Sequence, residues 1–128
     1  MVELSKIKKG ERVADLGSGD GRISIAFAKS GAIVDAFELD EKLISEANKN
    51  SLSEKVNENI TIYKKDFWDS HLSSYSVIAI YPMPDIMPLL EEKLNKELKT
   101  GARVIVNFYP LPNWKYKTFK NNIYLYIK

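Results

Sequence analysis

The sequence predicts one α/β domain over residues 1–128, built on a mostly parallel sheet with helices on both faces and a C-terminal antiparallel hairpin. Two observations lead to this prediction. Short apolar runs rich in β-forming residues alternate four times with helix-like segments, which indicates parallel strands joined by right-handed crossovers. A last apolar run, residues 123–127, follows a loop instead of a helix. No repeat or linker divides the chain, and its length suffices for one domain.

Five apolar segments are expected to form the parallel strands: residues 11–16, 32–37, 60–63, 77–81 and 103–108. Helices are expected at residues 22–30, after the capping residue Asp40, and from Asp85 onward. The polar residues 48–59 are expected to form a loop. An apolar stripe on the last helix comprises Met87, Leu90, Leu94 and Leu98.

The composition restricts the chemistry that the chain can perform. The absence of cysteine excludes disulfides, thiolate catalysis and cysteine metal sites, and a lone histidine, His71, argues against a histidine metal centre or a Ser-His-Asp triad. We therefore expect no metal. With 19 basic and 17 acidic residues, the charge neither indicates nor excludes nucleic acid. No apolar run approaches the roughly 20 residues of a membrane span, and no signal peptide is recognisable, so we expect a cytoplasmic protein.

Polar residues follow three successive predicted strands. The first strand runs into Asp15-Leu16-Gly17-Ser18-Gly19-Asp20-Gly21-Arg22, a strand end, a tight turn and a helix start. Alternate glycines let the backbone approach a ligand, and amides at a helix N-terminus can bind a carboxylate. Glu38 lies 19 residues after Gly19, close to the spacing of about 20 for an acid that binds ribose hydroxyls. Asp66 can accept from an adenine amino group, while Phe67 or Trp68 covers the ring.

Two classes of cofactor compete for this glycine loop. A nicotinamide dinucleotide site has the spacing Gly-x-Gly-x-x-Gly, with the third glycine inside the helix. In residues 17–21 the third glycine comes one position earlier. Asp15 would also repel a pyrophosphate, whereas its charge suits a cofactor that carries an ammonium and a sulfonium. The residues therefore favour S-adenosyl-L-methionine.

The loop sequence resembles that of the class I S-adenosylmethionine-dependent methyltransferases, whose fold is Rossmann-like. Two later segments are similar to a narrower group: Met87-Pro88-Leu89-Leu90-Glu91-Glu92-Lys93-Leu94 and residues 102–114. This group is the protein-lysine methyltransferases, including the archaeal broad-specificity enzyme and the mitochondrial enzymes that act on the adenine nucleotide translocase and the ATP synthase c-subunit. The resemblance covers the chain from Val13 to its end, and it implies methyl transfer to a protein lysine.

The resemblance also implies roles for individual residues. Methionine contacts fall on the loop, ribose contacts on Glu38 and adenine contacts on Asp66. The expected cofactor-binding residues are Asp15, Gly17, Ser18, Gly19, Asp20, Glu38, Asp66 and Phe67. Tyr81 is expected to orient the acceptor amine as the catalytic residue, with packing at the rim as its alternative. The expected substrate contacts are Asn107, Phe108 and Trp114, and for Trp114 packing of the hairpin is the competing interpretation.

Some features depart from these patterns. The stretch Tyr81-Pro82-Met83-Pro84 superficially resembles the motif of amino-methylating nucleic-acid enzymes, but it lacks the amide or acid that binds the exocyclic amine. Ser76 stands where many methyltransferases have Asp. The family carries an N-terminal helical segment that helps to cover the cofactor, whereas residues 1–10 form only a short segment. Three explanations are open: the cover over the cofactor is minimal, an oligomeric or other partner supplies it, or it lies in a segment outside this sequence. Alternatives are a cofactor-binding module without catalysis and a small-molecule methyltransferase.

Overall fold

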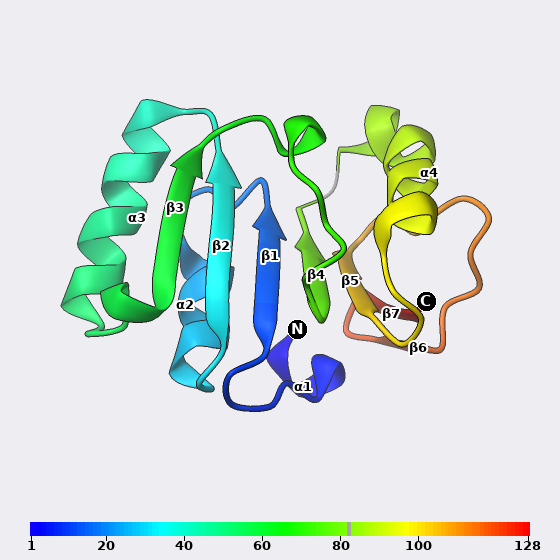
Figure 1. Ribbon diagram of the computed structural model, residues 1–128, viewed down its shortest axis with the longest axis horizontal. Coiled ribbons are helices and arrows are strands. Elements are labelled where there is room, and N and C mark those ends of the chain that lie inside the picture. The colour runs from blue at the N-terminus through cyan, green and yellow to red at the C-terminus, as the bar shows by residue number, and fades with distance from the viewer. Residues whose placement is uncertain (82) are drawn as a thin grey trace.

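The computed structural model describes residues 1–81 and 83–128 and has the expected α/β architecture (Figure 1). A seven-stranded sheet has the strand order β3-β2-β1-β4-β5-β7-β6. The strands are β1 (Arg12–Leu16), β2 (Ile33–Glu38), β3 (Ile60–Lys64), β4 (Val77–Ile80), β5 (Arg103–Asn107), β6 (Thr118–Lys120) and β7 (Ile123–Ile127). The first five are parallel, and the last two are antiparallel, so the predicted sheet with its terminal hairpin is confirmed.

Helices cover both faces of this sheet. They are α1 (Val2–Ser5), α2 (Arg22–Lys29), α3 (Glu41–Ser53) and α4 (Met87–Glu97), with short 3-10 turns η1 (Asn57–Asn59), η2 (Phe67–Asp69) and η3 (Pro84–Ile86). In Figure 1, α2 lies behind the sheet and α4 in front of it. Phe27 of α2 packs on the layer that contains Val13, and Leu90 of α4 packs on the opposite layer with Ile78. In the described part of the chain, no helix is long and apolar enough to cross a bilayer.

The helix after Asp40 is longer than the sequence predicted. Asp40 caps α3 by accepting from the Lys42 and Leu43 amides, but the helix continues to Ser53, so the prediction of a loop over residues 48–59 was wrong for its first half. The helix ends where Lys55 adopts a positive φ of 60°. The amide of Val56 then donates to Ser51 O, as in a Schellman cap. This cap normally has glycine at the left-handed position, so its lysine gave no recognisable stop.

The other boundaries shift for local reasons. The helix expected from Asp85 starts as the turn η3 and becomes α-helical at Met87. Leu98 is buried with the rest of the predicted stripe, although its backbone is extended and α4 ends one residue earlier. Pro82, expected to end the fourth strand, lies outside the described residues. The β6–β7 hairpin turns at Asn121 and Asn122, which both adopt positive φ, as a two-residue type I′ turn requires.

Two buried acids stabilise the architecture on the α4 face. Asp35, the one charged residue in its predicted strand, accepts from Arg12 Nη2 and from Tyr75 Oη, both at 2.7 Å. Glu91 of α4 is 6% exposed and accepts from the amide of Asn113 at 2.8 Å, from its Nδ2 at 2.9 Å and from the Trp114 amide at 3.0 Å. Glu91 therefore fixes the loop after β5 against the helix.

We expect Glu91→Leu to lower the free energy of unfolding by about 2–4 kcal/mol, because buried amide donors lose a charged acceptor. Urea denaturation at pH 7 measures this change. Glu92→Leu, at the neighbouring exposed position, is the control and is expected to stay within about 0.5 kcal/mol of the wild type. Equal stability of the two variants would contradict the role of Glu91.

Candidate functional site

A cleft of about 810 Å³ opens at the carboxyl ends of the central strands. This is the edge where parallel sheets collect ligands, at the point where the strand order reverses between β1 and β4. The cleft is lined by the glycine loop after β1, the end of β2, the segment after β3 and the end of β4. The three strand-end groups predicted from the sequence, at Asp15, Glu38 and Asp66, therefore share one cavity.

The glycine loop is held by the neighbouring strand. The amides of Gly17 and Ser18 both donate to Phe37 O at 3.0 Å. Gly21 has a φ of 88° and begins α2, and a Cβ there would lie 3.1 Å from the Cβ of Ala47. Only glycine therefore permits both the turn and the close approach of α3.

Asp15 lies beneath this loop and is 2% exposed. Its Oδ2 accepts from Ser24 Oγ, in the first turn of α2, at 2.6 Å. Burial raises the pKa of Asp15 to about 6, although hydrogen bonds from Ser24 oppose the shift; the charge of Glu38 adds to it. The contact between Ser24 and Asp15 was not predicted from the sequence. The only sign of it was that a polar residue, Ser24, stands in the first turn of an otherwise apolar helix face.

A buried hydroxyl of the loop lacks a partner. Ser18 is 8% exposed and lines the cleft, and its Oγ finds no hydrogen-bond partner among residues 1–81 and 83–128. A bound polar group would satisfy this hydroxyl. Asp20, also in the lining, is half-buried, and its Oδ2 pairs with Arg22 Nη2 at 3.1 Å.

Glu38 is fixed by backbone amides at the end of β2. Its Oε1 accepts from the Gly19 amide at 2.8 Å, and Oε2 accepts from the amides of Leu39 at 3.0 Å and Asp40 at 3.1 Å. A carboxylate offers about four acceptor positions, so capacity remains for a ligand hydroxyl. The same contact ties the glycine loop to β2.

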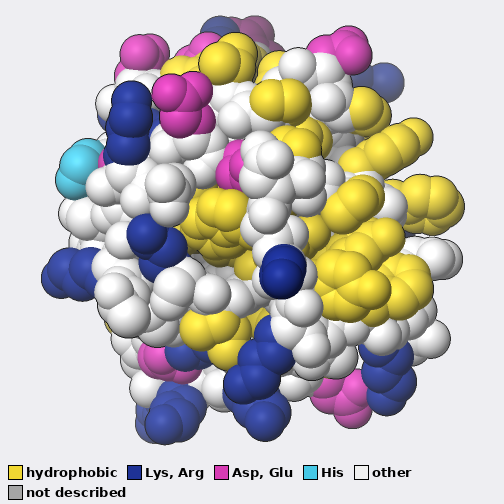
Figure 2. Space-filling view, turned by 90° about the vertical axis from the view of Figure 1, so that its right-hand side faces the viewer, with side chains coloured by type: hydrophobic (Ala, Val, Ile, Leu, Met, Phe, Trp, Pro, Cys, Tyr) yellow, Lys and Arg dark blue, Asp and Glu magenta, His cyan; other side chains and the backbone are white. Residues whose placement is uncertain are grey.

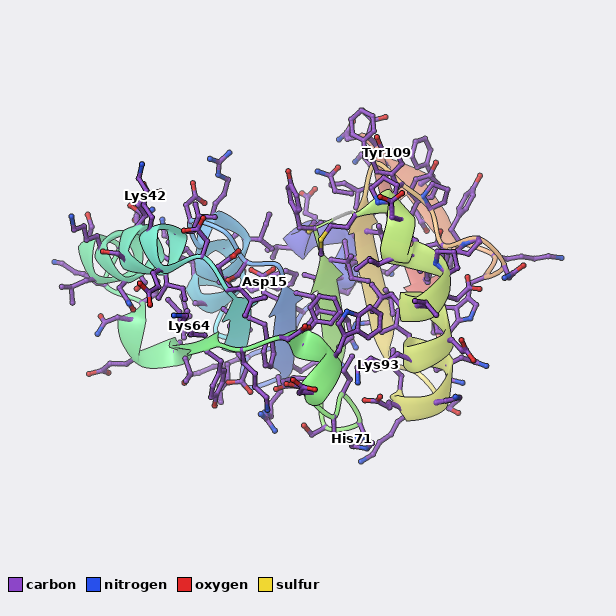
Figure 3. All side chains as sticks on the ribbon, turned by 90° about the horizontal axis from the view of Figure 1, so that it is seen from above. Asp15, Lys42, Lys64, His71, Lys93 and Tyr109 are labelled. Carbon is purple, nitrogen blue, oxygen red and sulfur yellow. The ribbon has the colours of Figure 1, made fainter. Side chains whose placement is uncertain are left out.

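The segment after β3 is supported from α4. Asp66 Oδ1 accepts from the Trp68 amide at 3.1 Å, and the buried Phe67 ring packs on Trp68 at 4.9 Å. Lys93 Nζ donates to Ser70 O at 2.7 Å and to Trp68 O at 3.3 Å, and it pairs with Glu97 at 2.7 Å. Figure 3 shows Lys93 on α4 and Asp15 at the middle of the sheet. This support was not predicted from the sequence, where its one trace was the i, i+4 pair of Lys93 and Glu97.

Of the four residues expected to contact the methyl acceptor, some line the cleft and others do not. Tyr81 is 65% exposed and lines the cleft, as does Asn107. Phe108 is outside the lining; it is 61% exposed, and its φ of 74° turns the chain away from β5. Trp114 is also outside the lining and packs on Tyr126 with ring centroids 6.3 Å apart. The structure thus brings two of these four residues to the cleft.

Over the residues that the structure describes, no group of three or more His, Cys, Asp or Glu side chains is arranged to hold a metal ion.

The family described as the ANTKMT methyltransferase domain matches residues 15–118. The chain belongs to this family. It is 39% identical over 114 residues to the lysine N-methyltransferase of the ATP synthase c-subunit from Rattus norvegicus, a match that covers 89% of this chain and 52% of that protein. It is 31% identical over 137 residues to a protein-lysine N-methyltransferase of Saccharolobus islandicus, covering 99% of this chain and 85% of that protein.

The fold likeness extends to solved structures. An RNA methyltransferase from Salinibacter ruber, in complex with S-adenosyl-L-homocysteine, superimposes with a TM-score of 0.93 at 26% identity and covers 98% of this chain and 86% of that chain. This likeness confirms the Rossmann-like class I methyltransferase fold. The chain spans about half the length of the vertebrate lysine methyltransferases of the ATP synthase c-subunit that it matches.

The raised pKa of Asp15 predicts a dependence of stability on pH. Between pH 3.8 and about 6 the unfolded chain ionises this group while the folded chain keeps it protonated, so its contribution to stability falls as pH rises. We expect Asp15→Asn to be more stable than the wild type by about 1–3 kcal/mol at pH 8, with the difference closing toward pH 4. Urea denaturation at both pH values tests this, and a less stable variant at pH 8 would refute it. The exposed substitution Asp69→Asn is the control.

Proposed function

We propose that this protein is an S-adenosyl-L-methionine-dependent methyltransferase that methylates lysine side chains of proteins. The observation that carries the proposal is the cleft in which Asp15, Glu38 and Asp66 meet beside the glycine loop. The family match and the lysine methyltransferase names of its relatives support the choice of acceptor.

The residues of the cleft fit each part of this cofactor. The buried carboxylate of Asp15 provides negative charge at the methionine end, and the unpartnered Ser18 hydroxyl provides a hydrogen-bonding group. Glu38 retains acceptor capacity for a ribose hydroxyl, and Asp66 stands beside the aromatic rings of Phe67 and Trp68 for adenine. An acidic pocket of this kind favours a cationic cofactor over a pyrophosphate. When bound, the cofactor supplies an electrophilic methyl group on a sulfonium.

The protein must deliver a neutral amine in line with that methyl group. A lysine with a pKa near 10.4 is protonated at pH 7, and its neutral form costs roughly 4.6 kcal/mol. Apolar and aromatic surroundings at the edge of the cleft lower this cost by desolvating the ammonium, and the positive charge of the cofactor sulfonium lowers it further. Tyr81 and Asn107 both line the cleft. The Tyr81 hydroxyl is suited to accept a hydrogen bond from the lysine amine and so to orient it. No strong general base is then required.

Isothermal titration with S-adenosyl-L-methionine, followed by methyl transfer from radiolabelled cofactor, tests the proposal. The purified protein is offered separately a dialysed protein extract, purified RNA and a small-molecule extract. We expect label in protein, and mass spectrometry to identify methyl-lysine. Label confined to RNA or to the low-mass fraction would contradict a protein acceptor. Cofactor binding without transfer to any fraction would support the binding-module alternative.

We expect Tyr81→Phe to lower kcat about tenfold while the cofactor Kd stays unchanged, because the variant loses one hydrogen bond to the acceptor amine but no cofactor contact. Steady-state rates with an acceptor protein identified in the extract measure kcat, and calorimetric titration of the cofactor measures its Kd. Tyr63→Phe, an exposed tyrosine on β3, is the matched control. A parallel loss in both tyrosine variants would remove Tyr81 from the mechanism.

A further inference from the structure

We propose that aromatic side chains on the C-terminal hairpin and the loop before it form a docking platform for an extended segment of the acceptor protein, one that carries apolar and acidic side chains. This inference rests on the proposed function and specifies the chemistry of its substrate. The platform comprises Phe108, Tyr109, Tyr116, Phe119 and Tyr124.

The platform is apolar and accessible. Four of its members are between 46% and 61% exposed, and Tyr124 is half-buried. Phe119 and Tyr116 both pack on Tyr124, with ring centroids 4.5 Å and 5.2 Å apart. Figure 2 shows hydrophobic side chains gathered on this side of the molecule, with lysine and arginine side chains around them. An exposed aromatic cluster of this kind is typical of an interaction surface.

The platform begins at the cleft. Asn107 lines the cleft, and Phe108 and Tyr109 follow it directly in the chain. The Phe108 amide donates to Asn122 O at 2.7 Å, which ties these two residues to the turn of the hairpin. Asp15 is the penultimate residue of β1 and Tyr109 follows the end of β5 by two residues, so both lie at the carboxyl edge of the parallel strands; Figure 3 shows Tyr109 near the hairpin strands. A polypeptide with its lysine in the cleft can therefore extend across the platform without leaving the surface.

The charge around the platform defines the partner further. No Asp or Glu follows Glu97 in the sequence, whereas lysines alternate with the platform aromatics at Lys115, Lys117 and Lys120. None of these three lysines forms an ion pair with the residues that the structure describes. The surface therefore complements an apolar segment with acidic neighbours and repels a basic one.

The backbone favours a polypeptide over other anionic partners. β6 is the edge strand of the sheet, and its outer side has no neighbouring strand within the described residues. Backbone groups on such an edge pair with an added extended strand. RNA or an anionic lipid surface would use the lysines and the rings, but neither would complete the strand ladder.

Fluorescence anisotropy with labelled synthetic peptides tests docking separately from methyl transfer. One peptide has a central lysine flanked by Phe, Leu and Glu; a second replaces Glu with Lys, and a third replaces Phe and Leu with Ser. We expect the first to bind about tenfold more tightly than either of the others. The double variants Tyr116→Ser/Phe119→Ser and Lys117→Glu/Lys120→Glu should each weaken its binding about tenfold, with the cofactor Kd unchanged.

The matched control carries Leu52→Ser and Lys49→Glu on α3, both exposed positions far along the chain from the platform. It should bind the acidic apolar peptide like the wild type. Equal binding of all three peptides, or unchanged binding by both platform variants, would overturn the inference. Loss of oligouridine or phosphatidylserine-vesicle binding in the platform variants, with peptide binding intact, would also overturn it. Peptide docking without methyl transfer would support the platform and count against the proposed function.

Discussion

Burial of the Asp15 carboxylate beneath the glycine loop is the constraint on which the rest of the site depends. Keeping an acid 2% exposed in the middle of a sheet costs free energy, which is visible in the pKa of Asp15 at about 6. Ser24 reduces this cost with one 2.6 Å hydrogen bond, but no basic side chain is paired with Asp15 in the described structure. A cationic ligand in the cleft would supply the missing charge. The fold thus gives up stability at the position where a cofactor ammonium would bind.

The remaining elements hold the Asp15 carboxylate at a fixed position relative to Glu38 and Asp66, the groups expected to bind the other parts of a ligand. Glu38 accepts from the Gly19 amide and so joins the loop to β2. Lys93 reaches from α4 to two carbonyls after β3, and Glu91 holds the loop after β5 on the same helix. The helix α4 therefore supports the segment after β3, which lines the cleft beside the expected adenine group, and it also fixes the loop after β5, which follows the cleft-lining Asn107.

Much of this arrangement could be predicted from sequence because it depends on local pattern. The alternation of strands and helices indicated the parallel order. The glycine loop after Asp15 and the spacing from Gly19 to Glu38 indicated that these two acids stand at the ends of adjacent strands. What could not be predicted depends on contacts between distant residues or on unusual backbone. Lys55 ends α3 in a conformation typical of glycine, and Glu91 binds the amide of Trp114, 23 residues later in the chain. No periodicity reports such contacts.

The most direct test of the central claim is whether cofactor binding releases a proton from Asp15. At pH 6 about half of the Asp15 side chains are protonated, and a bound ammonium should keep them ionised. Titration calorimetry with S-adenosyl-L-methionine at pH 6, in two buffers of different ionisation enthalpy, counts the released protons. The account predicts release of about half a proton per site by the wild type and none by Asp15→Asn, which should also bind more weakly. Equal affinity and equal proton release in the two proteins would contradict it.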